Sequence, residues 1–209
     1  MSPYEPLQGQ SEESSVLGMV EFLSIARGIL ASDAMVKAAP ITMLSSHPID
    51  PGRYLSVITG DLASVEASVK AGFDAAGSEY TVYQFVLANL HTQVFKALQG
   101  LAPTPKRDAV GIVETFSAAS IVKAADAACK AAPVELATLH LALRLGGKGY
   151  AVIVGDIADV EASVDAGVRE AGATLYQSAI VPNPYEDIYV HLLARDRGCY
   201  SGWVESEWT

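Results

Sequence analysis

Charged residues are sparse in this chain, and basic residues are the scarcer kind. Its 209 residues include 14 Lys and Arg against 24 Asp and Glu, a formal net charge of −10. No basic run occurs anywhere in the sequence. Because phosphate groups are bound by clustered Lys and Arg, the sequence predicts no nucleic-acid partner and no anionic membrane surface.

Long apolar runs and cysteines are scarce as well. No apolar stretch approaches the roughly 20 residues that a transmembrane helix needs. Residues 1–15 carry no Lys or Arg and no apolar core, so they lack both parts of a secretory signal. Cys129 and Cys199 are too few for a disulfide framework, and Cys129 stands among alanines, as a small buried side chain would. We therefore expect a cytosolic protein.

What the chain does contain is an internal repeat. Leu-Gly-Met-Val-Glu at 17–21 recurs 93 residues later as Val-Gly-Ile-Val-Glu at 110–114. Asp-Ala-Met-Val-Lys-Ala-Ala-Pro at 33–40 recurs at the same spacing as Asp-Ala-Ala-Cys-Lys-Ala-Ala-Pro. Such self-similarity indicates two copies of one domain.

The spacing of the repeat then changes by two. Residues 65–69 recur letter for letter at 160–164, which is an offset of 95. The second copy therefore has two extra residues between Pro133 and Gly155. We expect this insertion in a loop between strands.

Each copy has the pattern of a small α+β domain. Apolar positions at helical spacing alternate with β-branched and apolar runs. Ser24 and Asp61 precede helical segments as N-caps, and the proline and glycine content of residues 48–52 indicates a turn. The order βαββαβ predicts two tandem ferredoxin-like domains, with both main helices on one face of each sheet. In the first copy, the expected strands are 16–22, 41–47, 53–59 and 81–90, and the expected helices are 24–39, 62–78 and 92–99.

The repeat divides the chain into five parts. These are an N-terminal extension (1–15), a first domain (16–100), a linker (101–108), a second domain (109–194) and a C-terminal tail (195–209). The linker combines two prolines with three charged residues. The tail carries Tyr200, Trp203 and Trp208, which either pack across a subunit surface or are loosely ordered.

No catalytic constellation is present, and we predict that the chain is not an enzyme. The glycine-rich residues 145–149 lie between two strands rather than opening a helix, which argues against a phosphate site. Glu21 and Glu114 occupy equivalent places, which duplication explains better than a catalytic pair does. The four histidines lack metal-ligand spacing; they are His47, His91, His140 and His191.

Three segments of the second copy carry a resemblance to a known family. Ala-Val-Gly-Ile-Val-Glu-Thr (109–115), Ala-Ala-Asp-Ala-Ala-Cys-Lys-Ala-Ala (124–132) and Val-Gly-Asp-Ile-Ala-Asp-Val-Glu-Ala-Ser-Val (154–164) resemble bacterial microcompartment shell domains. The closing segment of that family usually reads Pro-Arg-Pro-His, where this chain has Asn183 and Tyr185 in place of Arg and His. The resemblance covers both copies and is strongest to the tandem-domain, trimer-forming members of propanediol-utilisation compartments.

The resemblance implies a quaternary structure. Members of this class form homotrimers whose six domains mimic a hexamer, and these pseudohexamers tile the microcompartment shell beside other shell proteins, both hexamers and pentamers. It also implies a tile-edge contact for Lys37 and Lys130. A single helix lysine is ordinarily solvated, but recurrence in both copies favours the edge.

In shell tiles, the turn between the second and third strands surrounds the symmetry axis, where a pore admits small metabolites. Three chains would place three Asp50 carboxylates around this opening, and such a ring favours cations. Nearby Arg53 and Lys148 carry the opposite charge, so the net sign stays open, and an Asp50 that caps its own turn is an equal alternative. The resemblance assigns the pore lining to Ile49, Asp50, Pro51, Gly52, Leu145, Gly146, Gly147 and Lys148.

One departure from the family concerns a cofactor. Propanediol-type members carry a Cys in this turn, and three thiolates hold an iron–sulfur cluster at the axis. Asp50 stands at that place here, and carboxylates are poor cluster ligands compared with thiolates. We therefore expect neither a cluster nor another metal or cofactor. A tandem ferredoxin-like regulatory protein that binds a small molecule is the alternative function.

Overall fold

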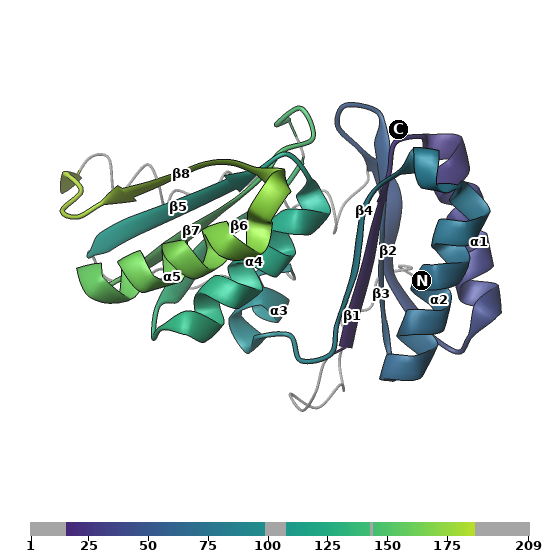
Figure 1. The fold of residues 1–209 in the computed structure, drawn as a ribbon, viewed down its shortest axis with the longest axis horizontal. Coiled ribbons are helices and arrows are strands. Elements are labelled where there is room, and N and C mark those ends of the chain that lie inside the picture. Colours follow the sequence, from purple (N-terminus) through teal and green to yellow (C-terminus); the bar gives the residue numbers. More distant parts are fainter. Residues whose placement is uncertain (1–15, 99–107, 143, 187–209) are drawn as a thin grey trace, which may run out of the picture.

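The computed structural model describes residues 16–98, 108–142 and 144–186, which form two domains of the same architecture (Figure 1). The first domain contains β1 (Val16–Phe22), α1 (Ile25–Ala38), β2 (Thr42–Ile49), β3 (Arg53–Gly60), α2 (Leu62–Ala76), β4 (Thr81–Leu87) and α3 (Thr92–Leu98). The second contains β5 (Ala109–Thr115), α4 (Ala118–Ala131), β6 (Glu135–Leu141), β7 (Gly149–Gly155), α5 (Ile157–Ala171) and β8 (Leu175–Val181). The N-terminal extension, most of the linker, the end of the second domain and the aromatic C-terminal tail lie outside the described residues. None of the described helices is long and apolar enough to cross a membrane.

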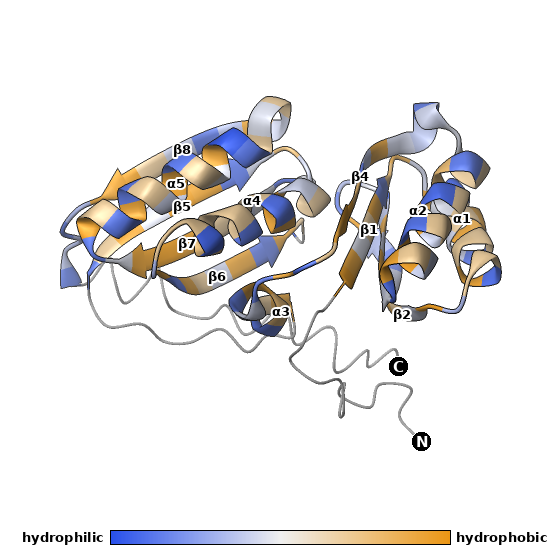
Figure 2. Cartoon of the chain, turned by 60° about the horizontal axis from the view of Figure 1, so that its bottom comes forward, coloured by the Kyte–Doolittle hydropathy of each residue, from blue (hydrophilic) through white to orange (hydrophobic). Residues whose placement is uncertain are grey.

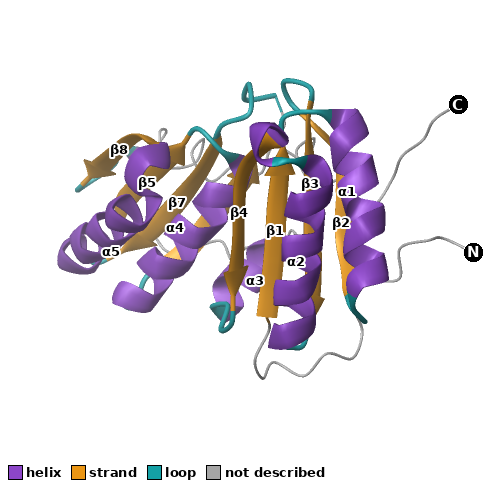
Figure 3. Ribbon diagram, turned by 45° about the vertical axis from the view of Figure 1, so that its right-hand side comes forward, coloured by secondary structure: helices purple, strands orange, loops and turns teal. Residues whose placement is uncertain are grey.

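Each domain is built on one antiparallel sheet. The strand orders are β2-β3-β1-β4 and β6-β7-β5-β8, which are equivalent in the two copies. Helices α1 and α2 lie side by side on one face of the first sheet (Figure 3). Gly18 shows how closely they pack, because a Cβ there would lie 2.7 Å from Val65 Cγ1 of α2. The predicted α+β class with tandem ferredoxin-like βαββαβ domains is confirmed.

Side-chain caps begin the helices where the sequence predicts them. Ser24 accepts a hydrogen bond from the Arg27 N–H at 3.4 Å, and Asp61 accepts one from the Ser64 N–H at 2.9 Å. Ser117 does the same for α4 through the Ser120 N–H at 3.2 Å. Each cap satisfies a helix N–H group that has no partner within its own helix.

Several boundaries differ from the prediction, among them the end of β4, which lies at Leu87 rather than at residue 90. Strand β2 continues through Pro48 to Ile49, so Pro48 belongs to the strand rather than to the turn. A proline lacks the N–H that a central strand needs, but β2 is at the edge of its sheet and tolerates it. The two-residue insertion lies between β6 and β7, in the loop at 142–148, as predicted.

The first helix of each domain packs against the third strand through one glycine and one large side chain, and the two domains place the glycine differently. In the first domain, Gly28 of α1 lies against Tyr54 of β3, and a Cβ on Gly28 would come within 2.5 Å of the Tyr54 ring. The equivalent pair in the second domain is Ile121 of α4 and Gly149 of β7, where a Cβ on Gly149 would lie 2.4 Å from Ile121 Cγ2. The small residue is on the helix in one copy and on the strand in the other, so one large side chain fills the gap between helix and strand in each.

A shared core joins the two domains. Helix α4 contacts β1 and β4 on the helix-free face of the first sheet, opposite α1 and α2 (Figure 1). Leu17, Met19 and Phe85 from that face belong to the same buried cluster as Ala118 and Val122 of α4. Strand β1, which contributes to this core, is predominantly apolar (Figure 2). We call this contact between the first sheet and α4 the seam.

Candidate functional site

The structure brings the two predicted pore turns together. The Asp50 carboxylate accepts a hydrogen bond from the backbone N–H of Arg144, in the other turn. Gly147 has a positive φ of 88°, and a Cβ there would lie 3.0 Å from Pro51 Cδ and 3.2 Å from the Asp50 carbonyl oxygen. A larger residue at 147 would therefore push the two turns apart.

Asp50 does not close its own turn with this bond. That turn is closed by the Gly52 N–H, which donates to the Ile49 carbonyl at 3.0 Å. The Asp50 side chain instead links one domain's turn to the other's. Ile49 is buried, whereas Pro51, Gly52 and Gly146 are exposed.

Both basic residues beside these turns are paired with a glutamate. Arg53 Nη1 lies 2.6 Å from Glu21 Oε1, and Lys148 Nζ lies 2.5 Å from Glu114 Oε1. The hydrogen bond with Glu114 raises the pKa of Lys148, so this amine stays charged. Since the two pairs occupy equivalent positions in the repeat, Glu21 and Glu114 are the acidic members of a duplicated ion pair.

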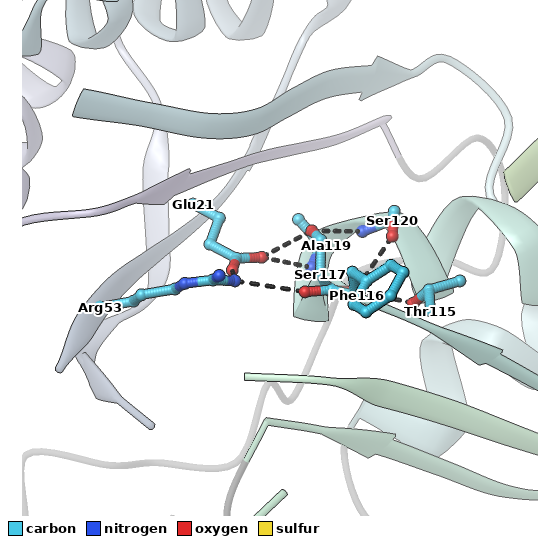
Figure 4. A network of polar contacts seen from close by, with 7 residues as sticks. All are labelled: Glu21, Arg53, Thr115, Phe116, Ser117, Ala119 and Ser120. Carbon is cyan, nitrogen blue, oxygen red and sulfur yellow. Dashed lines mark hydrogen bonds and ion pairs between the residues drawn. The ribbon is translucent and has the colours of Figure 1, made fainter. Parts of the chain in front are cut away.

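The first of these pairs also caps a helix across the seam (Figure 4). Glu21 Oε2 accepts from Ser117 Oγ at 2.7 Å and from the Ala119 N–H at 3.1 Å, both at the start of α4. Arg53 Nη1 donates to the Phe116 carbonyl at 3.2 Å. The Glu21 side chain is fully buried, and the N-terminal end of the α4 dipole favours its negative charge. We call Glu21 and Arg53 the seam clamp.

Sequence reasoning missed the seam clamp. It treated Glu21 as a product of duplication, because no short-range spacing connects it with Ser117, 96 residues away. The available signal was the joint recurrence of two residues, Glu21 as Glu114 and Arg53 as Lys148, at the positions that precede a helix and follow a turn.

The two predicted tile-edge lysines have different surroundings. Lys37 forms an ion pair at 2.5 Å with Asp33 on its own helix, and its side chain is 72% exposed. Lys130 pairs with Asp126 at 2.6 Å and also donates to the Asn89 carbonyl of the first domain. Lys130 therefore takes part in the seam.

The second end of the seam is also hydrogen-bonded. Asp126 Oδ1 accepts from the His91 N–H at 2.7 Å. Gln93 donates to the Val134 carbonyl at 2.8 Å and accepts from the Leu136 N–H at 2.7 Å. Hydrogen bonds between described residues thus hold the two domains together at both ends of α4.

The hydrogen bonds and ion pairs described above join parts of the fold to one another. Among the described residues, no three His, Cys, Asp or Glu side chains lie close enough together to hold a metal ion. His47 and His140 occupy equivalent places in β2 and β6, and His140 stacks on Tyr150 at 5.3 Å.

Comparison with known proteins identifies the family. The BMC domain model matches the chain twice, at residues 16–90 and 109–184. The chain is 40% identical to the bacterial microcompartment shell protein PduT of Citrobacter freundii, over 84% of this chain and 96% of PduT. It is 25% identical to the carboxysome assembly protein CcmO of Synechocystis, over 88% of this chain and 67% of CcmO.

Solved structures agree with this assignment. A crystal structure of a microcompartment protein from Desulfitobacterium hafniense is 41% identical and has a TM-score of 0.72, covering 83% of this chain and 97% of that one. The fused permuted hexameric shell protein MSM0275 shares the fold alone, with 17% identity and a TM-score of 0.56 over 75% of this chain and 80% of its own. The resemblance noted in the sequence is confirmed, and the regulatory alternative gains no support. The chain belongs to the BMC-domain family of bacterial microcompartment shell proteins.

Proposed function

We propose that three copies of this chain close into a ring of six domains that serves as a structural tile of a microcompartment shell in the cytoplasm. The ring is supported by a difference in burial between equivalent residues of α1 and α4. On α4, Ala118 and Val122 are fully buried at the seam. The equivalent residues of α1, Ile25 and Ile29, are 37% and 54% exposed.

The exposed stripe on α1 fits a second copy of the chain. It continues with Val36, which is 47% exposed where its counterpart Cys129 is 5% exposed. Exposed aliphatic residues in such a row are typical of an association surface. A head-to-tail contact uses two different surfaces and repeats until it closes, and three copies of a two-domain chain provide six places.

The paired turns would line the opening of this ring. Asp50 and Arg144 would face it as adjacent charges, while Arg53 and Lys148 are neutralised by their glutamate partners. A narrow opening with fixed charges selects solutes by size and charge. The ring would thus offer a passage for small metabolites, selective through Asp50, and act without catalysis.

The residues at these turns do not fit an iron–sulfur cluster. Thiolates are the ligands that hold such clusters, and neither turn contains a cysteine. Cys129 is buried in α4, within the shared core. We propose that the opening carries no cluster, so anaerobic reconstitution with iron and sulfide should give no stoichiometric absorbance near 400 nm.

The outer edge of the tile would meet other shell proteins, both hexamers and pentamers. Lys37 and Lys130 would lie along that edge. Lys37 keeps two N–H donors for a neighbouring tile beside its ion pair with Asp33. Lys130 keeps one, because it binds both Asp126 and the Asn89 carbonyl.

Native mass spectrometry and negative-stain microscopy test the tile. We expect a mass of three chains for the purified protein, and extended flat layers or closed shells when it is overproduced alone or with hexameric shell proteins. A monomer that persists at high concentration would overturn the ring. A compact dimer stabilised by a small molecule would instead favour the regulatory alternative.

A further inference from the structure

The seam inside the chain leaves two complementary halves unused. The first half is Glu114 with Lys148, the second copy of the seam clamp. The second half is the start of α1, where Ser24 and Ala26 correspond to Ser117 and Ala119 of α4. Within one chain, Glu114 binds Lys148 and Ser24 accepts from the Arg27 N–H, and no hydrogen bond joins the two halves among the described residues.

The unused halves keep the chemistry that makes the seam. A carboxylate with an adjacent cation is retained on β5 and directly before β7, and a serine N-cap is retained before α1. Both are accessible: the side chains of Glu114 and Lys148 are 28% and 33% exposed, and Ala26 is exposed where its counterpart Ala119 is buried. By contrast, Glu21 and Ser117, already joined in the seam, are buried.

We propose that Glu114 of one copy caps helix α1 of a second copy, accepting hydrogen bonds from Ser24 Oγ and the Ala26 N–H as Glu21 does from Ser117 and Ala119. This inference rests on the proposed ring. Lys148 keeps its bond to Glu114 and donates to the Leu23 carbonyl of that second copy, as Arg53 donates to the Phe116 carbonyl.

The same contact connects assembly with the opening. Lys148 is the residue directly after the turn at 144–147, and Arg53 directly follows the turn at 50–52. Within the chain, the seam clamp holds Arg53 beside Gly147. In the ring, the cap on a neighbour's α1 would fix Lys148, so each of the two turns would be followed by a basic residue that is held at a seam.

A charge cycle tests the cap. Ser24→Asp preserves the N-cap of α1, since aspartate caps helices as well as serine, but it places a second carboxylate against Glu114. We expect its dissociation constant for the ring to rise by about tenfold or more, because like charges at an interface repel. In Ser24→Asp/Glu114→Gln the repulsion is removed, and the dissociation constant should return to within about threefold of the wild-type value. Masses from native mass spectrometry over a dilution series give these constants.

The internal seam provides the matched control. Ser117→Asp places the same repulsion against Glu21 inside one chain, so it should lower the free energy of unfolding of the chain. A wild-type protein of three chains whose Ser24→Asp variant dissociates at the same concentration would overturn the cap and leave the ring intact. A wild-type protein that is monomeric throughout would overturn the ring, and the cap with it.

Discussion

The Glu21 carboxylate and the Ser117 hydroxyl lie 2.7 Å apart, although 96 residues separate them along the chain. The bond ties the first strand of one domain to the first helix of the next. Since the carboxylate also binds Arg53 of β3, a single buried group joins two strands of the first sheet to α4.

Glu21→Gln should therefore destabilise the folded chain. It removes the charge that balances Arg53 and that the N-terminus of α4 favours, at a cost of about 2–3 kcal/mol. Urea unfolding followed by circular dichroism measures the change. Glu66→Gln, on the exposed face of α2, is the control and should shift the free energy of unfolding by less than about 0.5 kcal/mol. An equal effect of the two substitutions would show that the clamp carries no stability.

Asp50→Asn should alter the charge selectivity of the opening. The asparagine oxygen can still accept from the Arg144 N–H, so the two turns keep their geometry while three carboxylates lose their charge. We expect the permeability ratio of cations to anions to fall, measured as a reversal potential across a planar bilayer that contains the assembled protein. Asp33→Asn on α1 is the control. If the reversal potential of Asp50→Asn matches that of the wild type, Asp50 is a structural link and not a selectivity group.

Acidification should weaken the fold through His47. Burial lowers the pKa of His47, and of His91, below the ordinary value of 6.5. Between the pKa of a histidine in the folded chain and its higher pKa in the unfolded chain, the unfolded chain binds more protons. Stability therefore falls as the pH drops below about 6.5. His47→Gln should flatten this part of the stability profile, measured by thermal unfolding from pH 7.5 to pH 5. A variant with the wild-type slope would exclude His47 as the cause.

Cys129 should resist alkylation in the folded protein. Burial raises the pKa of its thiol to about 12, and the reactive thiolate is scarce at pH 8. In a Cys199→Ser background, intact mass after iodoacetamide treatment should show no adduct until denaturant is added. Labelling under native conditions faster than global unfolding would show that α4 opens locally at the seam.

Gly28 and Tyr54 should behave as one unit. Gly28→Ile would crowd the aromatic ring of Tyr54 and should lower the free energy of unfolding by about 1–3 kcal/mol or more. Tyr54→Gly would leave a cavity that lowers it by about 3–5 kcal/mol. The double variant recreates the Ile121–Gly149 pair, so its loss of stability should be smaller than the sum by at least about 1 kcal/mol. Denaturant unfolding of the four proteins gives this coupling energy, and strict additivity would contradict the exchange.

Local patterns predicted most of the fold. Apolar periodicity located the helices, and the caps at Ser24 and Asp61 follow from residue type alone. The repeat placed the insertion in the correct loop because the matching segments on either side keep their own offsets. Pro48 was misplaced since its tolerance depends on β2 being an edge strand, which is a property of the sheet order and not of the neighbouring residues.

Long-range contacts were less accessible from sequence. The two turns were predicted as pore lining, but not the bond from Arg144 to Asp50 that joins them. Lys130 was predicted at a tile edge, and its contact with Asn89 emerges only when α4 is placed on the first sheet. Periodicity reports which face of an element is buried and not which element covers it, so the seam clamp had no local signal.

The opposite placement of glycine in the two domains has a consequence for their ancestry. A chimera with α4 in place of α1 would oppose an isoleucine to Tyr54, and one with α1 in place of α4 would oppose two glycines at the same depth. The halves of this molecule have therefore lost interchangeability, although their backbones share one plan. Recombination between the two repeats would produce a chain that is crowded at one site or hollow at the other, which protects the duplicated domain from being homogenised.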